Sequence, residues 1–193
     1  MAARLAILGA FLALGVTLYG QSANEKDASE NTVVLRDLGM RYSPPTGMVD
    51  KTSESALQAR DRANSYTTKA AELLLDLSSD GADDSQEWHQ IWMFHFPRAQ
   101  LANLNEWMAE AKVNGALAGP KAQPAGQPTS STFGGHNFLV SEFEQSEPPL
   151  TKHARIYTTI CKTQLVSFVF VANSAEQVTA MEDSLKSLKF ADK

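Results

Sequence analysis

Three acidic side chains lie close to three basic ones in the second half of the chain, and they are the densest group of residues that could do chemistry. They are Glu142, Glu144, Glu147, Lys152, His153 and Arg155. Two carboxylates about 5–9 Å apart can cleave a glycosidic bond, and Glu142 and Glu144 share one side of a strand. Because nothing in the sequence indicates a substrate cleft around them, we predict instead that these charges pair across adjacent strands. Such a pair contributes about 0.2–1 kcal/mol.

The four histidines do not have the spacing of a metal site. His89 and His95 share one face of an expected strand, but six residues place their Cα atoms roughly 20 Å apart, too far to hold one ion. His136 and His153 could approach each other if their strands are neighbours. We therefore predict no metal and no cofactor, with all four imidazoles exposed or hydrogen-bonded.

Nucleophile and phosphate-binding motifs are also missing from the sequence. It contains no G-x-S-x-G elbow, no P-loop, no dinucleotide fingerprint and no zinc-protease motif. Its one cysteine, Cys161, excludes an internal disulfide and a multi-cysteine zinc site. We interpret Cys161, which stands beside Lys162, as a packing residue, and we assign no catalytic, cofactor-binding or metal-binding residue.

An aromatic stripe follows strand spacing between residues 88 and 96. Trp88, Trp92, Phe94 and Phe96 would all point to the same side of one strand. Such a stripe could bind a sugar or a lipid. Since aromatic residues at strand spacing more often form a core, we predict that these four are buried.

Length and composition limit the class of protein. The chain has 193 residues, of which 43% are hydrophobic and 20% charged, and its net charge is −5. These values fit one globular domain and exclude a disordered, collagen-like or polytopic membrane chain. Because there is no basic excess, we predict that nucleic acid is not a partner.

The N-terminus has the pattern of a secretory signal. Arg4 is the only charged residue among the first 24, and a 14-residue uncharged run, Leu5 to Leu18, follows it. A membrane-spanning helix needs about 20 apolar residues, whereas a signal needs about 7–15 and small residues at the cut. We predict a signal peptide over 1–23 with cleavage near Ala23 and a secreted or periplasmic location, the alternative being an uncleaved anchor. We expect no membrane contact after cleavage.

The mature chain is expected to form a single domain over residues 32–190, preceded by a disordered leader over 24–31. Periodicity predicts two short early strands, a long helix, a strand, a second helix from Leu101 to Ala111, three later strands and a closing helix. The expected ranges are 33–35, 38–42, 53–78, 88–96, 136–144, 155–161, 165–172 and 174–188. The second helix would bury Met108, and Ser174 would cap the last helix with Gln177 three residues on.

Residues 114–135 break both helical and strand periodicity. They hold 5 of the 11 glycines and 3 of the 8 prolines, which favours a flexible loop. Leu117 and Phe133 are its only large apolar residues. We expect a mobile segment, and since loops on a rigid scaffold often carry function, we expect a partner or ligand to engage this side.

The late strands determine the expected fold class. Short turns between them imply antiparallel pairing, and the segment 165–172 is apolar on both faces except at Ser167. A strand of that kind must be covered on both sides. We therefore predict an α+β fold with a single antiparallel β-sheet flanked by helices, an α/β/α sandwich.

This arrangement resembles the PsbP-like fold, in which helices flank a bent antiparallel sheet. The residues that carry the resemblance are the early segment 38–45, LGMRYSPP, and the late segment 165–190. The segment 147–160, EPPLTKHARIYTTI, is similar to that of uncharacterised secreted bacterial proteins. PsbP-like proteins are mostly non-catalytic accessory or assembly factors, so the resemblance implies such a role and transfers no site residue.

Two functional hypotheses follow from the sequence. The first is a secreted or periplasmic, non-catalytic accessory or binding module with an unknown protein or small-molecule partner. The alternative is a small exported hydrolase that uses Glu and His residues near the glycine-rich segment. A polar cleft that joins His136, His153 and a carboxylate would favour the hydrolase.

The first testable prediction concerns the signal segment. We expect the exported protein to begin between residues 21 and 25, because small residues there follow an apolar run too short to span a bilayer. N-terminal sequencing of the exported fraction measures the cut. An intact Met1 in that fraction would show that the segment is retained.

Overall fold

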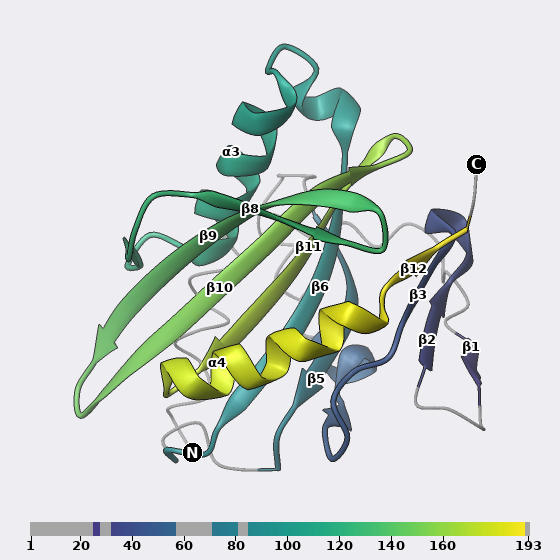
Figure 1. Ribbon diagram of the computed structural model, residues 1–193. Coiled ribbons are helices and arrows are strands. Elements are labelled where there is room, and N and C mark those ends of the chain that lie inside the picture. Colours follow the sequence, from purple (N-terminus) through teal and green to yellow (C-terminus); the bar gives the residue numbers. More distant parts are fainter. Residues whose placement is uncertain (1–24, 28–31, 57–70, 81–84, 192–193) are drawn as a thin grey trace.

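A large antiparallel sheet forms the centre of the molecule (Figure 1). The computed structural model describes residues 25–27, 32–56, 71–80 and 85–191. The large sheet has eight strands, of which β8 pairs with β9 beside β7. In spatial order seven of them are β4 (Val49–Asp50), β5 (Glu72–Ser78), β6 (His89–Pro97), β11 (Gln164–Ala172), β10 (Leu150–Cys161), β9 (His136–Glu147) and β7 (Gln123–Pro124). The eighth, β8 (Thr129–Phe133), lies off this order and pairs with β9.

Strand β11 lies in the middle of this sheet and is buried on both faces, as its sequence predicted. Phe168 and Phe170 point into one apolar cluster, whereas Val169 and Val171 point into a second cluster on the opposite face. All four are at most 3% exposed. The alternation follows from the two-residue repeat of a strand, which sends neighbouring side chains to opposite faces.

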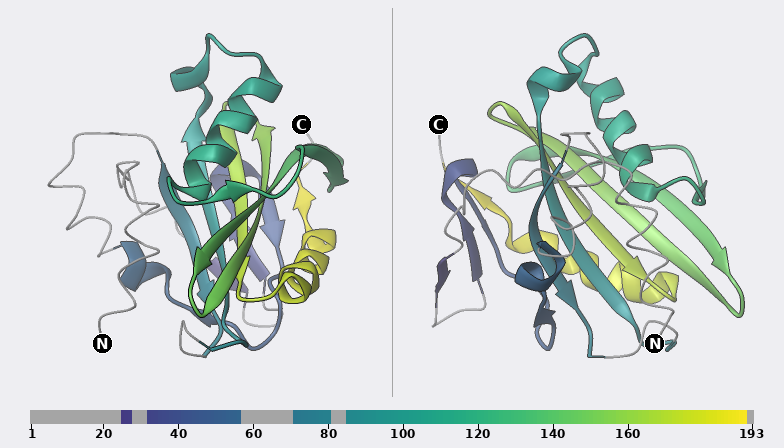
Figure 2. Two further views of the ribbon diagram at one scale, coloured as in Figure 1. Left: turned by 90° about the vertical axis from the view of Figure 1, so that its left-hand side faces the viewer. Right: turned by 180° about the vertical axis from the view of Figure 1, so that it is seen from behind.

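Two helices cover the two faces, so the predicted layering of helix, sheet and helix is confirmed (Figure 2). Helix α3 (Glu106–Ala118) packs on the cluster that contains Val169, and α4 (Ala175–Glu182) packs on the cluster that contains Phe168. The predicted cap of α4 is present: the Gln177 N–H donates to the Ser174 hydroxyl at 3.2 Å. Beyond α4 a 3-10 turn, Asp183–Ser187, continues toward the C-terminus.

The prediction of a single sheet is wrong, because a second sheet of four strands lies beside the first (Figure 1). Its order is β1 (Glu25–Asp27), β2 (Thr32–Leu35), β3 (Met40–Tyr42) and β12 (Lys189–Phe190). Two prolines follow β3 and have no N–H to give, which stops its ladder before the large sheet begins. The leader also differs from the prediction, since Glu25–Asp27 pairs with β2.

The predicted long helix over 53–78 is wrong at its C-terminal end. Residues 52–56 are helical, residues 57–70 lie outside the described residues, and Leu74 and Leu77 belong to strand β5. From Leu73 to Ser78 every side chain of β5 is buried. Leu73, Leu75 and Leu77 alternate along β5 with Glu72, Leu74, Asp76 and Ser78. Leu74 and Leu77 are also three residues apart, so they fit a helical repeat as well.

The second predicted helix begins later than its pattern suggested. A 3-10 turn over Arg98–Leu101 follows β6, and α3 starts only at Glu106, capped by the Asn105 side chain, which accepts the Met108 N–H at 2.8 Å. Met108 is 47% exposed, although the pattern placed it on the buried face. The face that α3 buries consists instead of Ala109, Val113, Asn114, Leu117 and Ala118.

The expectation of an irregular loop over 114–135 is also wrong. Its first residues complete α3, and the rest supplies β7, β8 and the turn between β8 and β9. Leu117 is 1% exposed and Phe133 packs against the apolar cluster under α4. Two of the glycines form a tight turn: Gly134 and Gly135 have φ of 54° and 78°, which suits a two-residue hairpin. The structure therefore gives no reason to expect this segment to be mobile.

Among the described residues, no helix combines the length and the apolar content needed to cross a bilayer. The signal segment predicted over 1–23 lies outside the described residues.

The buried faces of β11 give a direct test of the fold. We expect Phe168→Ala or Phe170→Ala to lower the free energy of unfolding by about 3–5 kcal/mol, because each ring is fully buried and leaves a cavity. Denaturant titration measures the loss. Trp107→Ala is the matched aromatic control, since Trp107 is 56% exposed and its loss should change stability by about 0.5 kcal/mol or less. A loss below about 1 kcal/mol in either variant at β11 would contradict the packing described here.

Candidate functional site

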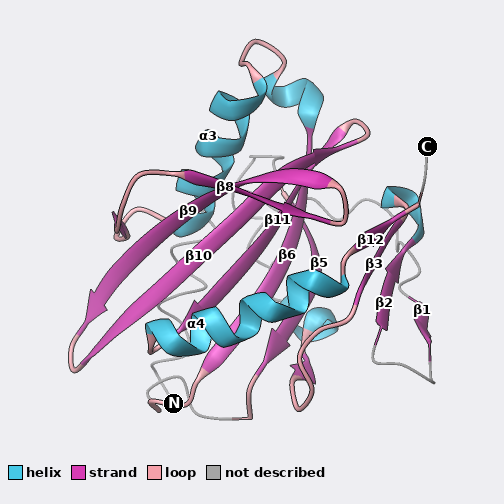
Figure 3. Ribbon diagram, viewed as in Figure 1, coloured by secondary structure: helices cyan, strands magenta, loops and turns pink. Residues whose placement is uncertain are grey.

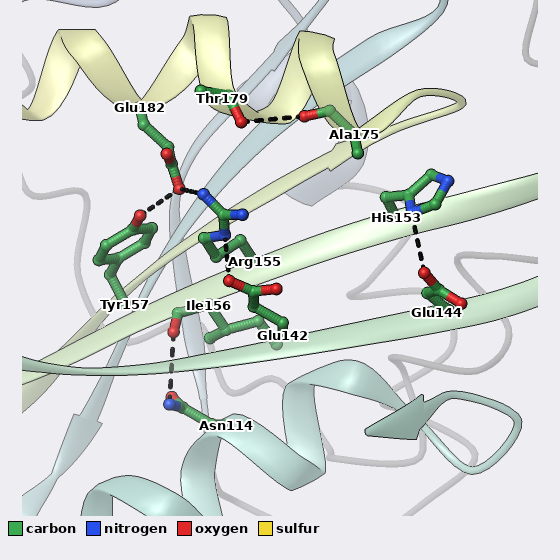
Figure 4. A network of polar contacts seen from close by, with 10 residues as sticks. All are labelled: Asn114, Glu142, Glu144, His153, Arg155, Ile156, Tyr157, Ala175, Thr179 and Glu182. Atoms are coloured by element: carbon green, nitrogen blue, oxygen red, sulfur yellow. Dashed lines mark hydrogen bonds and ion pairs between the residues drawn. The ribbon is translucent and has the colours of Figure 1, made fainter. Parts of the chain in front are cut away.

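Charged residues of β9 and β10 meet on the face of the sheet that carries α4 (Figure 4). Antiparallel pairing sets Arg155 opposite Glu142 and His153 opposite Glu144. The Arg155 Nε lies 3.0 Å from a Glu142 carboxylate oxygen, and the His153 Nδ1 lies 3.4 Å from a Glu144 carboxylate oxygen. The predicted cross-strand pairing of these charges is thus confirmed for two pairs.

Helix α4 adds a third carboxylate to this group. Glu182 accepts hydrogen bonds from the Arg155 guanidinium and from the Tyr157 hydroxyl (Figure 4). The Glu182 side chain is 16% exposed and that of Arg155 is 23% exposed. Arg155 therefore bridges two carboxylates that come from different elements, one on a strand and one on the helix. We call Glu142, Glu144, His153, Arg155 and Glu182 the acidic face.

Burial and hydrogen bonding fix the protonation states at the centre of this group. Burial, followed by the hydrogen bond to Glu182, raises the pKa of Tyr157 well above its usual range, so the phenol stays a donor. Burial alone would lower the pKa of Arg155, but the hydrogen bond and charge of Glu182 outweigh it, so the guanidinium stays charged. Neither group can accept a proton from a substrate near neutral pH.

The sequence did not single out Glu182 or Tyr157. Glu182 follows Met181, one member of the apolar stripe that docks α4, and so stands at the border of the buried face of the helix. Tyr157 is two residues from Arg155 and shares its strand face. Two hydrogen-bond donors on one strand face could have suggested that a common acceptor lies above them. The sequence could not identify Glu182 as that acceptor, because the position at which α4 crosses the strand depends on tertiary packing.

The four histidines do not converge. His95 contacts Glu72 on β5 through Nε2 at 2.6 Å, and the His89 Nδ1 lies 2.8 Å from the Glu87 carbonyl oxygen. His136 lies against the Phe190 ring with centroids 3.9 Å apart, at the far end of β9 from Glu144. Among the described residues, no group of three or more His, Cys, Asp or Glu side chains could hold a metal ion.

The aromatic stripe is buried, as predicted. Trp88, Trp92, Phe94 and Phe96 are at most 9% exposed and belong to the cluster under α3. The Lys152 ammonium lies over the Trp88 ring, 5.0 Å from its centroid. Cys161 is also buried, at 4% exposure, and its thiol donates to the Leu38 carbonyl at 3.3 Å. None of these residues presents a surface to a sugar or a lipid.

A buried polar cluster under α3 was not anticipated. Asn114 is fully buried, and its amide nitrogen donates to the Ser141 hydroxyl at 2.9 Å and more weakly to the Ile156 carbonyl at 3.4 Å (Figure 4). Its amide oxygen accepts from Thr158 at 2.5 Å, and the Thr158 hydroxyl lies 2.6 Å from that of Ser167. Since the groups are closed to solvent and satisfy one another, they fix where α3 sits on the sheet.

Asp76 is a second buried polar group that the sequence did not reveal. It is 1% exposed on β5, and its carboxylate accepts from the Ser55 hydroxyl and from the Gln90 amide at 2.5 Å. Its backbone N–H donates to the Thr52 hydroxyl at 2.9 Å. Burial raises the pKa of Asp76, although these hydrogen bonds and Lys51 oppose the rise. Asp76 thereby ties the helical residues 52–56 to the sheet.

Glu110 is the remaining described carboxyl group with a raised pKa. Burial, followed by the charge of Glu106, raises the pKa of Glu110 to about 7, and Arg98 partly opposes this. It is half-buried on α3 close to the exposed Trp107. A raised pKa alone does not make Glu110 part of a reaction centre, which also needs a nucleophile or a substrate position in suitable geometry.

Comparisons with known proteins concern the fold alone. No family model and no curated protein matches the sequence. Cyanobacterial PsbP (CyanoP) from Synechocystis sp. PCC 6803 is similar in structure, with 12% identity and a TM-score of 0.49 over 91% of this chain and 98% of that one. A PsbP structure is thus among the similar structures, as the sequence resemblance predicted.

Two further structures are similar over parts of the chain. A protein from Bacteroides thetaiotaomicron has 9% identity and a TM-score of 0.48 over 80% of this chain and 46% of that one. This chain therefore spans less than half of the length of that protein. LpqN, involved in cell envelope biogenesis of Mycobacterium tuberculosis, has 12% identity and a TM-score of 0.39 over 64% of this chain and 79% of that one.

The raised pKa of Asp76 gives a pH-dependent prediction. A folded-state pKa above the unfolded value of about 3.9 means that the buried carboxyl favours folding most when protonated and loses this contribution as pH rises through its folded pKa. We expect Asp76→Asn to gain stability relative to the wild type as pH rises from about 4. Denaturant titrations at several pH values measure the difference.

The control for this prediction is Asp80→Asn, since Asp80 is exposed in the turn after β5. It makes the same substitution at a site without the buried hydrogen bonds of Asp76. A stability difference for Asp76→Asn that does not change with pH, or that changes no more than the difference for Asp80→Asn, would contradict the assignment of a raised pKa to Asp76.

Proposed function

We propose that the protein is an exported, non-catalytic accessory or binding module that recognises a partner through the acidic face. The observation that carries this proposal is the mutual pairing of Arg155, Tyr157 and Glu182. Groups that are committed to one another in this way hold a surface in shape and leave neither a base nor a nucleophile for a reaction.

The charge of the acidic face favours a basic partner. Three carboxylates face one guanidinium and one imidazole. Glu142 and Glu144 have side chains that are 49% and 53% exposed, so each can accept further hydrogen bonds from outside. Lys or Arg side chains of a protein, or a small-molecule cation, would complete this arrangement, whereas a nucleic-acid backbone would be repelled.

The hydrolase alternative receives less support from the same geometry. It needs His136, His153 and a carboxylate around one centre. His153 lies opposite Glu144, and Glu144 is eight residues further along β9 than His136. Eight residues of extended strand span roughly 27 Å. A catalytic pair cannot act over that distance.

Export is supported by the sequence alone. The apolar run Leu5 to Leu18 has the length of a signal segment and is followed by small residues. Removal of Arg4 with the signal segment changes the net charge from −5 to −6. A mature module of this charge would attract basic partners outside the cytoplasm.

Binding to peptide arrays tests the proposal. The purified protein is applied to immobilised peptides that differ only in Lys and Arg content, with acidic peptides as a second set. We expect binding to basic peptides that weakens with salt, and a loss of about tenfold or more in Glu142→Lys/Glu144→Lys, because two contacts become repulsive. Glu54→Lys/Glu106→Lys is the control, since it makes the same charge change at exposed positions elsewhere.

Two results would overturn the proposal. One is equal binding by the two double variants, which would mean that only net charge matters. The other is turnover of chromogenic glycosides or esters that disappears in Glu142→Gln or His153→Ala, which would support the hydrolase.

A further inference from the structure

The outer strands of the two sheets are protected against partners in different ways. Strand β1 reads Glu-Lys-Asp, and β4, β7 and β12 have two residues each, with Asp50, Pro124 and Lys189 among them. Short length, charge and proline all discourage the addition of another strand. Strand β8 is one of the strands drawn in magenta in Figure 3. It reads TSSTF and has five residues, no charge and no proline.

Strand β8 also has an outer side with no strand beside it among the described residues, where it pairs with β9 alone. Three of its five residues are exposed and the other two are partly buried. It stands within a run of 20 residues, 122–141, that contains no Asp, Glu, Lys or Arg, in a chain that is 20% charged. Charge therefore gives no protection on either side of β8 in the sequence.

The turn after β8 determines which backbone groups face outward. Phe133 and His136 flank a two-residue turn, and residues that flank such a turn exchange both backbone hydrogen bonds. Since the direction alternates along a strand, Ser131 and Thr129 also bond to β9. The N–H and C=O groups of Ser130 and Thr132 consequently point away from the sheet.

We propose that β8 is a self-association edge, at which a second copy of this chain adds its own β8 in antiparallel orientation. A two-fold axis at Ser131 sets Ser130 of each copy opposite Thr132 of the other. Both residues have outward N–H and C=O groups, so each pair exchanges two backbone hydrogen bonds. Pro128 ends the ladder on one side, because it has no N–H, and the turn at Gly134 ends it on the other.

Side-chain complementarity favours a second copy over another partner. In this register Ser131 faces its own equivalent, the hydroxyls of Ser130 and Thr132 meet, and Thr129 faces Phe133, so no like charges oppose each other. A charged peptide would find no opposite charge on β8. Because the ladder is short, the association is weak and depends on concentration. It involves no residue of the acidic face, so it stands independently of the proposed function.

Sedimentation equilibrium over a range from micromolar to millimolar protein tests this association. We expect the average mass of the wild type to rise from that of one chain toward that of two. Ser131→Lys alone and Ser131→Glu alone should each weaken the association by at least about tenfold, because each sets like charges together at the two-fold axis. An equimolar mixture of the two variants should restore it, since the charges then attract.

Two further variants separate this edge from general effects. Ser130→Pro removes an outward N–H and no bond to β9, so it should abolish association without adding charge. Asn103→Lys adds the same charge as Ser131→Lys at an exposed position before α3 and should leave association unchanged. Circular dichroism verifies that each variant is folded. A wild type that keeps the mass of one chain throughout, or a mixture that fails to restore association, would overturn the proposal.

Discussion

The burial of β11 on both faces is the constraint on which the rest of the molecule depends. A strand in which Val166, Phe168 and Phe170 point one way and Leu165, Val169 and Val171 point the other cannot face water on either side. Both helices are therefore required. The strands on either side of β11, β10 and β6, extend the same two clusters, which makes the sheet the partition between two cores. The small second sheet closes one core, since Tyr42 of β3 packs edge to face on Phe168 with ring centroids 5.2 Å apart.

Apolar burial holds the helices on the sheet but does not by itself fix their position, because a smooth apolar face allows a helix to slide. Each helix has a polar contact that removes this freedom. Under α3 it is Asn114, which is inside the core and closed to solvent. On α4 it is Glu182, which is near the surface and bound by Tyr157 and Arg155. The difference in depth explains why only the second network leaves charge on a face that a partner can reach.

The sequence predicted the elements whose local and tertiary preferences agree. The hairpin of β10 and β11, the cap at Ser174 and the charge pairs on β9 and β10 all follow from alternation and spacing. It failed where one pattern fits two structures. Leu74 and Leu77 of β5 are three residues apart, a spacing that also fits a helix. Asp76 of the same strand is polar but buried, so its polarity gave no sign of which side faces solvent. Glu182 could not be assigned because its partners lie 25 and 27 residues away in the chain.

The segment over 114–135 shows why composition alone misleads about order. Its glycines and prolines suggested a chain without anchors, yet several belong to ordered elements: Gly134 and Gly135 make a hairpin turn, and Pro124 lies at the edge of the sheet. A Cβ at Gly134 would come within 2.9 Å of the Leu188 carbonyl oxygen and of the Phe190 ring, so the absence of a side chain lets the hairpin approach the C-terminal strand. The same lack of large and charged residues leaves β8 with a bare backbone edge. In this segment, the residues that allow close packing inside the molecule also leave its border open to another strand.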